Sequence, residues 1–167
     1  MKIFTLLGFL FTINLLASVV DEGFVAYNRG DIQKAESLYT QACESNNTNA
    51  CFYSAYLHDT GEGVPQNKLK AERLYTKACD GGFVRACSYL GLLYDTGDGV
   101  TQDKERARSL FKKSCDGGNL GGCWSLGVVY DKGDHVEINK ERAKSYYSKA
   151  CDGGFTGSCT SLGHLYN

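Results

Sequence analysis

The sequence predicts an all-α protein, an α/α solenoid of about four helical hairpins of 36 residues, each with one disulfide. Eight cysteines fall into four pairs, whose members lie eight residues apart and which follow one another every 36 residues. A fixed period of this length is typical of stacked repeats. The apolar residues have helical spacing, and a single proline in 167 residues is compatible with a largely helical chain.

The first helix of each hairpin is predicted from its apolar spacing. Ala71, Leu74, Tyr75 and Ala78 lie at i, i+3, i+4 and i+7, on one face of a helix. A residue that can cap free backbone N–H groups precedes each of these helices, and Gly-Gly follows three of them, as expected at helix ends. The predicted caps are Asp31, Asn67, Asp103 and Asn139.

The second helix of each hairpin has the same apolar logic but carries a small residue in its middle. Ala86, Leu90, Leu93 and Tyr94 form its apolar stripe. Because glycine weakens a helix, we expect a neighbouring helix to approach closely at this position. The small residues are Ala55, Gly91, Gly127 and Gly163.

These elements divide the chain into a leader and a row of repeats. Lys2, an apolar run from Ile3 to Leu16, and small residues at Ala17 and Ser18 predict a signal peptide over residues 1–18; an uncleaved anchor is the alternative. A half-repeat at 21–30 starts the stack. Units near 31–66, 67–102, 103–138 and 139–167 follow, so that the repeat region spans 21–167, and stacking buries the apolar stripes.

Export implies an oxidising compartment, in which paired cysteines form disulfides. Two cysteines eight residues apart flank one tight turn, whereas equivalent cysteines of successive units lie two helices apart, too far for a bond. Metal binding is the alternative, but no Cys-x-x-Cys is present and no histidine repeats beside the cysteines. The predicted pairs are Cys43–Cys51, Cys79–Cys87, Cys115–Cys123 and Cys151–Cys159.

The segment LGLLYDTGDGVTQDKERARSLFKKSCDGG, residues 90–118, resembles a SEL-like repeat, a relative of the tetratricopeptide repeat. The cysteine pair in every unit makes the chain similar to the Helicobacter cysteine-rich protein family over residues 21–167. Members are described as secreted, penicillin-binding proteins and slow β-lactamases. The resemblance therefore implies a secreted or periplasmic protein that binds, and slowly hydrolyses, β-lactams.

The residues themselves show no catalytic set for this hydrolysis. Ser109 and Lys112 form a Ser-x-x-Lys sequence, but they align with ordinary polar positions of the other repeats, and the companion motifs of serine β-lactamases are absent. His58, His135 and His164 form no zinc-binding cluster. We expect no metal and no cofactor, and whether the chain is an enzyme stays open; any β-lactam turnover should be slow.

A binding surface is the alternative function. Some positions of the second helices change from unit to unit, while the packing positions stay the same. Solenoids use such variable faces as concave binding surfaces. Arg85 lies at the head of this face. Phe52 and Trp124 could instead fill gaps between helices, and Arg85 could be merely solvated. The predicted face comprises Phe52, Tyr56, Arg85, Ser88, Leu92, Trp124, Val128 and His164.

Partners follow from the same composition. Lys plus Arg total 18 and Asp plus Glu total 19, so the chain lacks the basic surface that nucleic acids require. We expect a peptide, a cell-wall fragment, a β-lactam, or a host or periplasmic protein, and no stable membrane span after signal cleavage. Self-association through the last helix is a further alternative.

Overall fold

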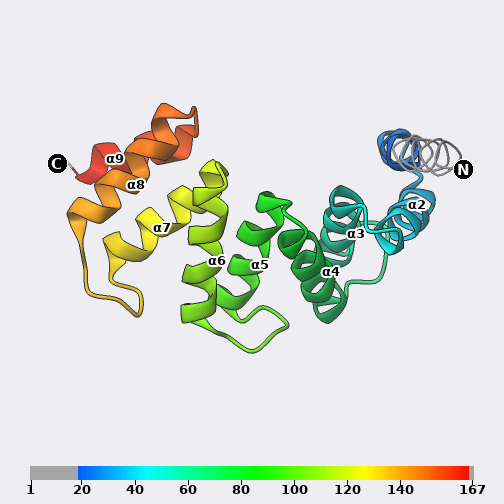
Figure 1. Cartoon of the computed structure of the whole chain (residues 1–167), viewed down its shortest axis with the longest axis horizontal. Coiled ribbons are helices and arrows are strands. Elements are labelled where there is room, and N and C mark those ends of the chain that lie inside the picture. Colours follow the sequence, from blue (N-terminus) through cyan, green and yellow to red (C-terminus); the bar gives the residue numbers. More distant parts are fainter. Residues whose placement is uncertain (1–18, 166–167) are drawn as a thin grey trace, which may run out of the picture. The chain divides into compact units, whose positions relative to one another are not determined.

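The computed structural model describes residues 19–165, and these contain helices and turns but no strand. The chain is all-α, with the repeated helical hairpins of an α/α solenoid, as predicted (Figure 1). The signal-peptide prediction for residues 1–18 lies outside the described residues. After a helical segment at 19–28 come α2 (Ile32–Glu44), α3 (Thr48–Thr60), α4 (Lys68–Asp80), α5 (Val84–Thr96), α6 (Lys104–Asp116), α7 (Leu120–Lys132), α8 (Lys140–Asp152) and α9 (Thr156–Leu165).

Polar side chains start the first helix of each hairpin, as predicted. The Asp31 carboxylate accepts a hydrogen bond from the backbone N–H of Lys34 in α2. Asn67, Asp103 and Asn139 cap α4, α6 and α8 in the same way. Each such cap is worth about 1 kcal/mol of helix stability, which explains why these helices begin at the same place in every repeat.

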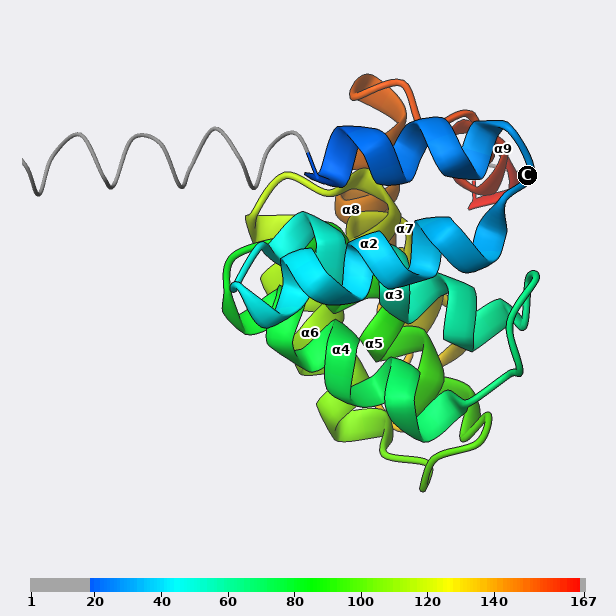
Figure 2. The ribbon, with the colours of Figure 1, turned by 90° about the vertical axis from the view of Figure 1, so that its right-hand side faces the viewer.

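The chain divides into two compact units, and the first ends at Gly81. In this unit α3 packs against both α2 and α4 (Figure 2). Its core is aromatic: the ring centroids of Tyr39 and Tyr53 lie 5.3 Å apart, and those of Phe52 and Tyr75 lie 5.7 Å apart. Tyr39, Phe52 and Tyr75 are all buried, so large side chains from successive helices fill the core of this unit.

The second unit begins at Gly82, and in it α5 to α9 pack in chain order. A Cβ atom at Gly91 would lie 2.7 Å from the ring of Phe111, and one at Gly127 would lie 2.4 Å from the ring of Tyr147. The expected close approach of a neighbouring helix is therefore confirmed at both glycines. At Gly163, in α9, nothing lies within 4 Å of such an atom.

Disulfides close the short turns between helices. Cys43–Cys51, Cys115–Cys123 and Cys151–Cys159 have Cα–Cα distances of 4.6, 4.5 and 4.8 Å, within the range that disulfides require. Cys79 and Cys87 are disulfide-bonded too, which makes four disulfides, one per repeat, as predicted. In the chain-entropy model, a closed loop of about nine residues contributes about 2.5 kcal/mol.

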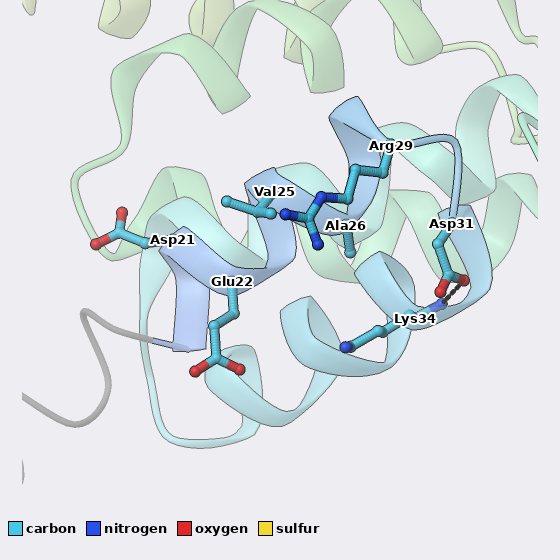
Figure 3. Close-up of a pocket in the computed structure, with 7 residues that line it drawn as sticks. All are labelled: Asp21, Glu22, Val25, Ala26, Arg29, Asp31 and Lys34. Atoms are coloured by element: carbon cyan, nitrogen blue, oxygen red, sulfur yellow. Dashed lines mark hydrogen bonds between the residues drawn. The ribbon is translucent and has the colours of Figure 1, made fainter.

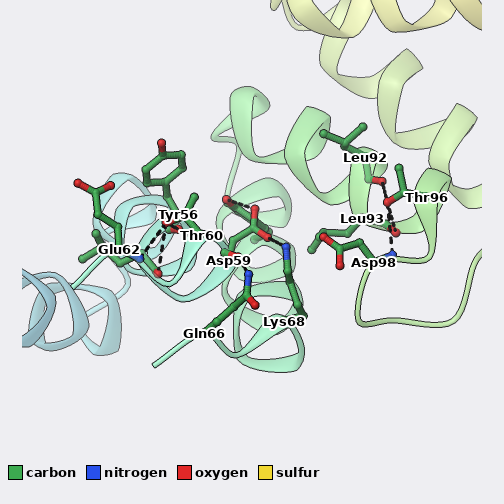
Figure 4. Close-up of polar contacts among 12 residues, drawn as sticks. Tyr56, Asp59, Thr60, Glu62, Gln66, Lys68, Leu92, Leu93, Thr96 and Asp98 are labelled. Carbon is green, nitrogen blue, oxygen red and sulfur yellow. Dashed lines mark hydrogen bonds and ion pairs between the residues drawn. The ribbon is translucent and has the colours of Figure 1, made fainter. Parts of the chain in front are cut away.

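The longer loops are held by a repeated polar arrangement, which Figure 4 shows for the loop after α3. After α3, the Lys68 ammonium lies 2.8 Å from the Asp59 carboxylate, and the Gln66 amide donates to the backbone carbonyl of Asp59 at 2.9 Å. The loop after α5 has the same two interactions. The loop after α7 keeps the lysine–aspartate pair but has Ile138, which is 62% exposed, in place of the glutamine. The third loop therefore differs most from the repeat pattern.

Candidate binding surface

The first candidate site is a hollow of about 650 Å³ in the second unit, formed where α7 meets α6 and α8. Its lining is polar at the helix surfaces and aromatic on one side. None of these residues belongs to the face predicted from the sequence. The lining residues are Glu105, Arg108, Ser109 and Lys112 of α6, Leu126 and Tyr130 of α7, and Arg142, Ser145 and Tyr146 of α8.

The aromatic side of this hollow consists of two stacked tyrosines. The rings of Tyr130 and Tyr146 lie 5.8 Å apart and are nearly parallel, with an angle of 7°. The guanidinium carbon of Arg142 lies 5.3 Å from the centroid of Tyr130, within cation–π range. Its nitrogen also donates to the Tyr130 hydroxyl at 3.5 Å. These contacts hold Arg142 at the edge of the hollow.

Three cations and one carboxylate line the hollow. Arg108 is paired with Glu105 at 3.1 Å on its own helix. Lys112 is paired with Asp116, and the hydrogen bond to that carboxylate raises the pKa of the lysine. Arg142 has no carboxylate partner anywhere in residues 19–165. The hollow therefore carries an excess of positive charge.

Four positions of the hollow, those of Arg108, Lys112, Tyr130 and Arg142, have equivalents in the first unit. The side chains at the equivalent positions form hydrogen bonds with one another. There, Glu36 accepts hydrogen bonds from Thr40 at 2.8 Å, from the ring of His58 at 3.0 Å and from Lys70 at 3.2 Å. Burial raises the pKa of Glu36, but these hydrogen bonds, the one from His58 first, outweigh burial and leave the pKa below its usual value.

Between the two clusters every residue changes. The equivalent positions lie 72 residues, or two repeats, apart. In the second unit the central carboxylate is replaced by a cation, and a neutral side chain is replaced by another cation. Such column-by-column comparison of the repeats is the sequence signal that could have revealed the hollow. The replacements are Glu36 by Arg108, Thr40 by Lys112, His58 by Tyr130 and Lys70 by Arg142.

The second candidate is the face predicted from the sequence, of which six residues lie in the second unit. Leu92 of α5 is 54% exposed, although it is apolar. On α7, Trp124 and Val128 are half-buried, and the Trp124 indole N–H donates to Ser161 of α9 at 3.2 Å. His164 of α9 is exposed. Trp124 thus links the second helices α7 and α9 and is itself only half-buried.

The remaining predicted face residues differ in how accessible they are. Phe52 is only 2% exposed and packs against Tyr53 and Tyr75, so its assignment to an accessible face was wrong and the gap-filling alternative is correct. Tyr56 is half-buried. Ser88 donates to Asn119 at 2.8 Å within the second unit, and Arg85 is exposed, with its guanidinium 5.7 Å from the Tyr89 ring.

The residues considered in the sequence for hydrolytic or metal chemistry are Ser109, Lys112 and the three histidines. Ser109 is exposed, and its neighbour Lys112 is held protonated by Asp116, which is the wrong state for a general base. His58 is buried against Glu36, whereas His135 and His164 are exposed. Within residues 19–165 no group of three histidines, cysteines or carboxylates is placed to hold a metal ion.

A further hollow lies beside the helical segment at 19–28 (Figure 3). Its three acidic side chains, Asp21, Glu22 and Asp31, outnumber its two cations, Arg29 and Lys34. The Asp31 carboxylate is already used to cap α2. Because this hollow has neither an aromatic wall nor an excess of cations, it is a weaker candidate than the hollow between α6, α7 and α8.

Together, the helical pairs, the cysteine cross-links and the variable surface positions define a disulfide-stapled α/α repeat protein. The chain belongs to the Sel1 repeat family, whose repeat matches residues 16–47, 48–83, 84–119 and 121–155. In this register the Cys115–Cys123 bond joins two adjacent family repeats. No curated protein sequence matches the chain significantly.

Solved structures extend this assignment. A Sel1 repeat protein of Oxalobacter formigenes is 28% identical, with a TM-score of 0.84 over 93% of this chain and 65% of its own. A protective antigen of uropathogenic Escherichia coli, c5321, is 25% identical with a TM-score of 0.83, over 90% of this chain and 33% of its own. This chain therefore spans less than two thirds of either relative.

Cysteine-rich protein B of Helicobacter pylori is also similar. It is 31% identical, with a TM-score of 0.63 over 79% of this chain and 95% of its own. The likeness supports the resemblance noted from the cysteine spacing. No helix in residues 19–165 is both long and apolar enough to cross a membrane.

Proposed function

We propose that this chain is an exported, non-enzymatic scaffold that binds another polypeptide. One observation carries the proposal: on a repeated frame of capped and cross-linked helices, the second unit presents Leu92, an apolar side chain that is 54% exposed, with the partly accessible Trp124 and Val128 on the next second helix. Repeat proteins bind partners through such variable positions, and Sel1 repeats in general mediate protein–protein interaction.

Export is the second part of the proposal, and the cysteines support it. Disulfides form and persist in secreted and periplasmic proteins and are rare in reducing compartments. A chain in which every described cysteine is bonded fits an oxidising compartment. The partner would then be a periplasmic or host protein, or a peptide; a cell-wall fragment is a less suitable occupant because Leu92, Trp124 and Val128, the side chains that carry the proposal, are apolar.

β-Lactam hydrolysis is the activity implied by the cysteine-rich relatives, and the geometry favours it less. Lys112, the lysine of the Ser-x-x-Lys sequence that begins at Ser109, is protonated and paired with Asp116, so it is in the wrong state to act as a base. A purified preparation of the oxidised chain should therefore hydrolyse a chromogenic cephalosporin no faster than its Ser109→Ala variant. A loss of hydrolysis in that variant would restore the enzymatic alternative.

The scaffold proposal is tested by binding. The oxidised chain, immobilised and exposed to periplasmic or host extract, should retain a partner in a saturable manner, and Leu92→Asp should reduce this retention at least about five-fold. Leu69→Asp in α4 is the matched control, because Leu69 is 57% exposed and also on a helix surface, but outside the predicted face. Equal retention by the two variants, or retention that never saturates, would contradict the proposal.

A further inference from the structure

We infer that the hollow between α6, α7 and α8 binds an acidic peptide segment. The inference rests on the proposed scaffold function and names the chemistry of a second contact surface on it. It concerns a group of side chains that the predicted face does not include. For brevity this group, defined as Arg108, Lys112, Tyr130, Arg142 and Tyr146, is called the cationic groove.

The repeats themselves show what the cationic groove lacks. In the first unit, Glu36 supplies the carboxylate that satisfies His58 and Lys70. At the equivalent place in the second unit stands Arg108, while the equivalent of Lys70 is Arg142, which is also a cation. A carboxylate brought by a partner would restore the missing negative charge, and guanidinium groups can bind it through two parallel hydrogen bonds.

The ion pairs that these cations form within the chain leave them able to bind a carboxylate of a ligand. Arg108 is held by Glu105, whose side chain is 76% exposed, so the pair is weakly stabilised by its surroundings and open to exchange with a ligand carboxylate. Arg142 needs no such exchange, because only the Tyr130 ring and hydroxyl contact its guanidinium among the described residues. The groove thus offers one ready cation and two exchangeable ones.

The aromatic wall points to a peptide as the source of the carboxylates. The stacked Tyr130 and Tyr146 rings present an apolar surface beside the cations, against which an apolar side chain of a peptide can pack. Helices packed at about 8–10 Å place α6 and α8 at most about 20 Å apart across α7, which about six residues of extended chain cross. A long polyanion is disfavoured by the net charge of −1.

The test is a titration of the full oxidised chain with a fluorescein-labelled, amidated eight-residue peptide that contains four Glu, one Leu, one Tyr and terminal Gly residues. The comparison peptide has Gln in place of every Glu. We expect saturable binding that is at least about ten-fold weaker for the Gln peptide and that weakens as salt rises from about 0.05 to 0.3 M, because the cations are exposed and screened.

Variants locate the binding. Arg142→Gln and Arg108→Gln should each weaken it about five-fold or more, whereas Lys132→Gln, which removes one exposed charge from the end of α7, should change it less than about two-fold. Circular dichroism should show the same helix content in all three. The inference would be overturned by equal affinities for the two peptides or by equal effects of the three substitutions. It would also be overturned if the chain self-associates and Arg142→Gln abolishes this, because the groove would then bind a second copy of the chain.

The two proposals fail separately. If the acidic peptide does not bind while partner retention still depends on Leu92, the groove inference fails and the scaffold function stands. If the acidic peptide binds as expected but no partner is retained from extracts, the scaffold proposal has failed at the predicted face, and the groove remains as a site for acidic segments.

Discussion

The close approach of α7 and α8 at Gly127 allows a substitution that has a matched control in the same chain. Gly127 lies in the middle of α7, and a Cβ atom there would stand 2.4 Å from two ring carbons of Tyr147, a side chain that is only 2% exposed. Real Cβ contacts are wider than this, so Gly127→Ala must displace the tyrosine ring or separate α7 from α8. Gly163 holds the same repeat position in α9, with nothing within 4 Å.

The magnitude follows from two terms. Replacing a helical glycine with alanine contributes up to about 1 kcal/mol of stability, and forcing a methyl group into a packed core costs about 1–3 kcal/mol. Both variants gain the first term, but only Gly127→Ala has the second. We therefore expect Gly163→Ala to be neutral or stabilising, and Gly127→Ala to be less stable than Gly163→Ala by about 1–3 kcal/mol.

Urea unfolding of the oxidised proteins, followed by circular dichroism at 222 nm (a wavelength specific to helices), measures this difference. The disulfides stay intact in all samples, so that the unfolded states are comparable. Equal free energies of unfolding for the two variants would refute the reasoning, because they would mean that Tyr147 does not press on α7 as the structure has it.

Three further predictions concern other parts of the repeats. Glu36→Gln should flatten the pH dependence of stability below about pH 5. The pKa of Glu36 is lower in the folded than in the unfolded chain, so its carboxylate, which is hydrogen-bonded to His58, stabilises the fold at neutral pH and loses this contribution as pH falls through the folded pKa. Free energies of unfolding measured at a series of acidic pH values will show the difference. Replacing Cys115 and Cys123 together with Ala should cost about 2.5 kcal/mol, measured by urea unfolding. His135→Gly should stabilise the chain by about 0.5–1 kcal/mol in thermal melts, since His135 has φ of 53° where the equivalent loops have glycine.

Much of the fold could be predicted because the same sequence signals, such as the N-cap residue and the cysteine pair, recur in every repeat. The N-cap at Asp103 and the turn closed by Cys115 and Cys123 depend on residues that are neighbours in sequence, and such local rules transfer directly to the structure. The glycine in α7 was also interpretable, because a glycine repeated at one helical position requires a packing reason.

Surface assignments were harder, since exposure depends on what packs from other helices. Phe52 lies at the same repeat position as Trp124, yet Phe52 is buried against Tyr53 and Tyr75 whereas Trp124 is only half-buried. The cationic groove escaped prediction for a related reason. Its side chains come from three helices, and their convergence becomes visible only when Arg108 is compared with Glu36 across two repeats.

The central claim is that each short turn between the two helices of a repeat is closed by its own disulfide, which holds the helices that carry the proposed binding surfaces. Mass spectrometry of peptides from the non-reduced protein, purified from the compartment where it resides, tests this claim most directly. We expect no free thiol and four cross-links, each between cysteines eight residues apart. Free thiols in most molecules, or cross-links between cysteines of different turns, would contradict it.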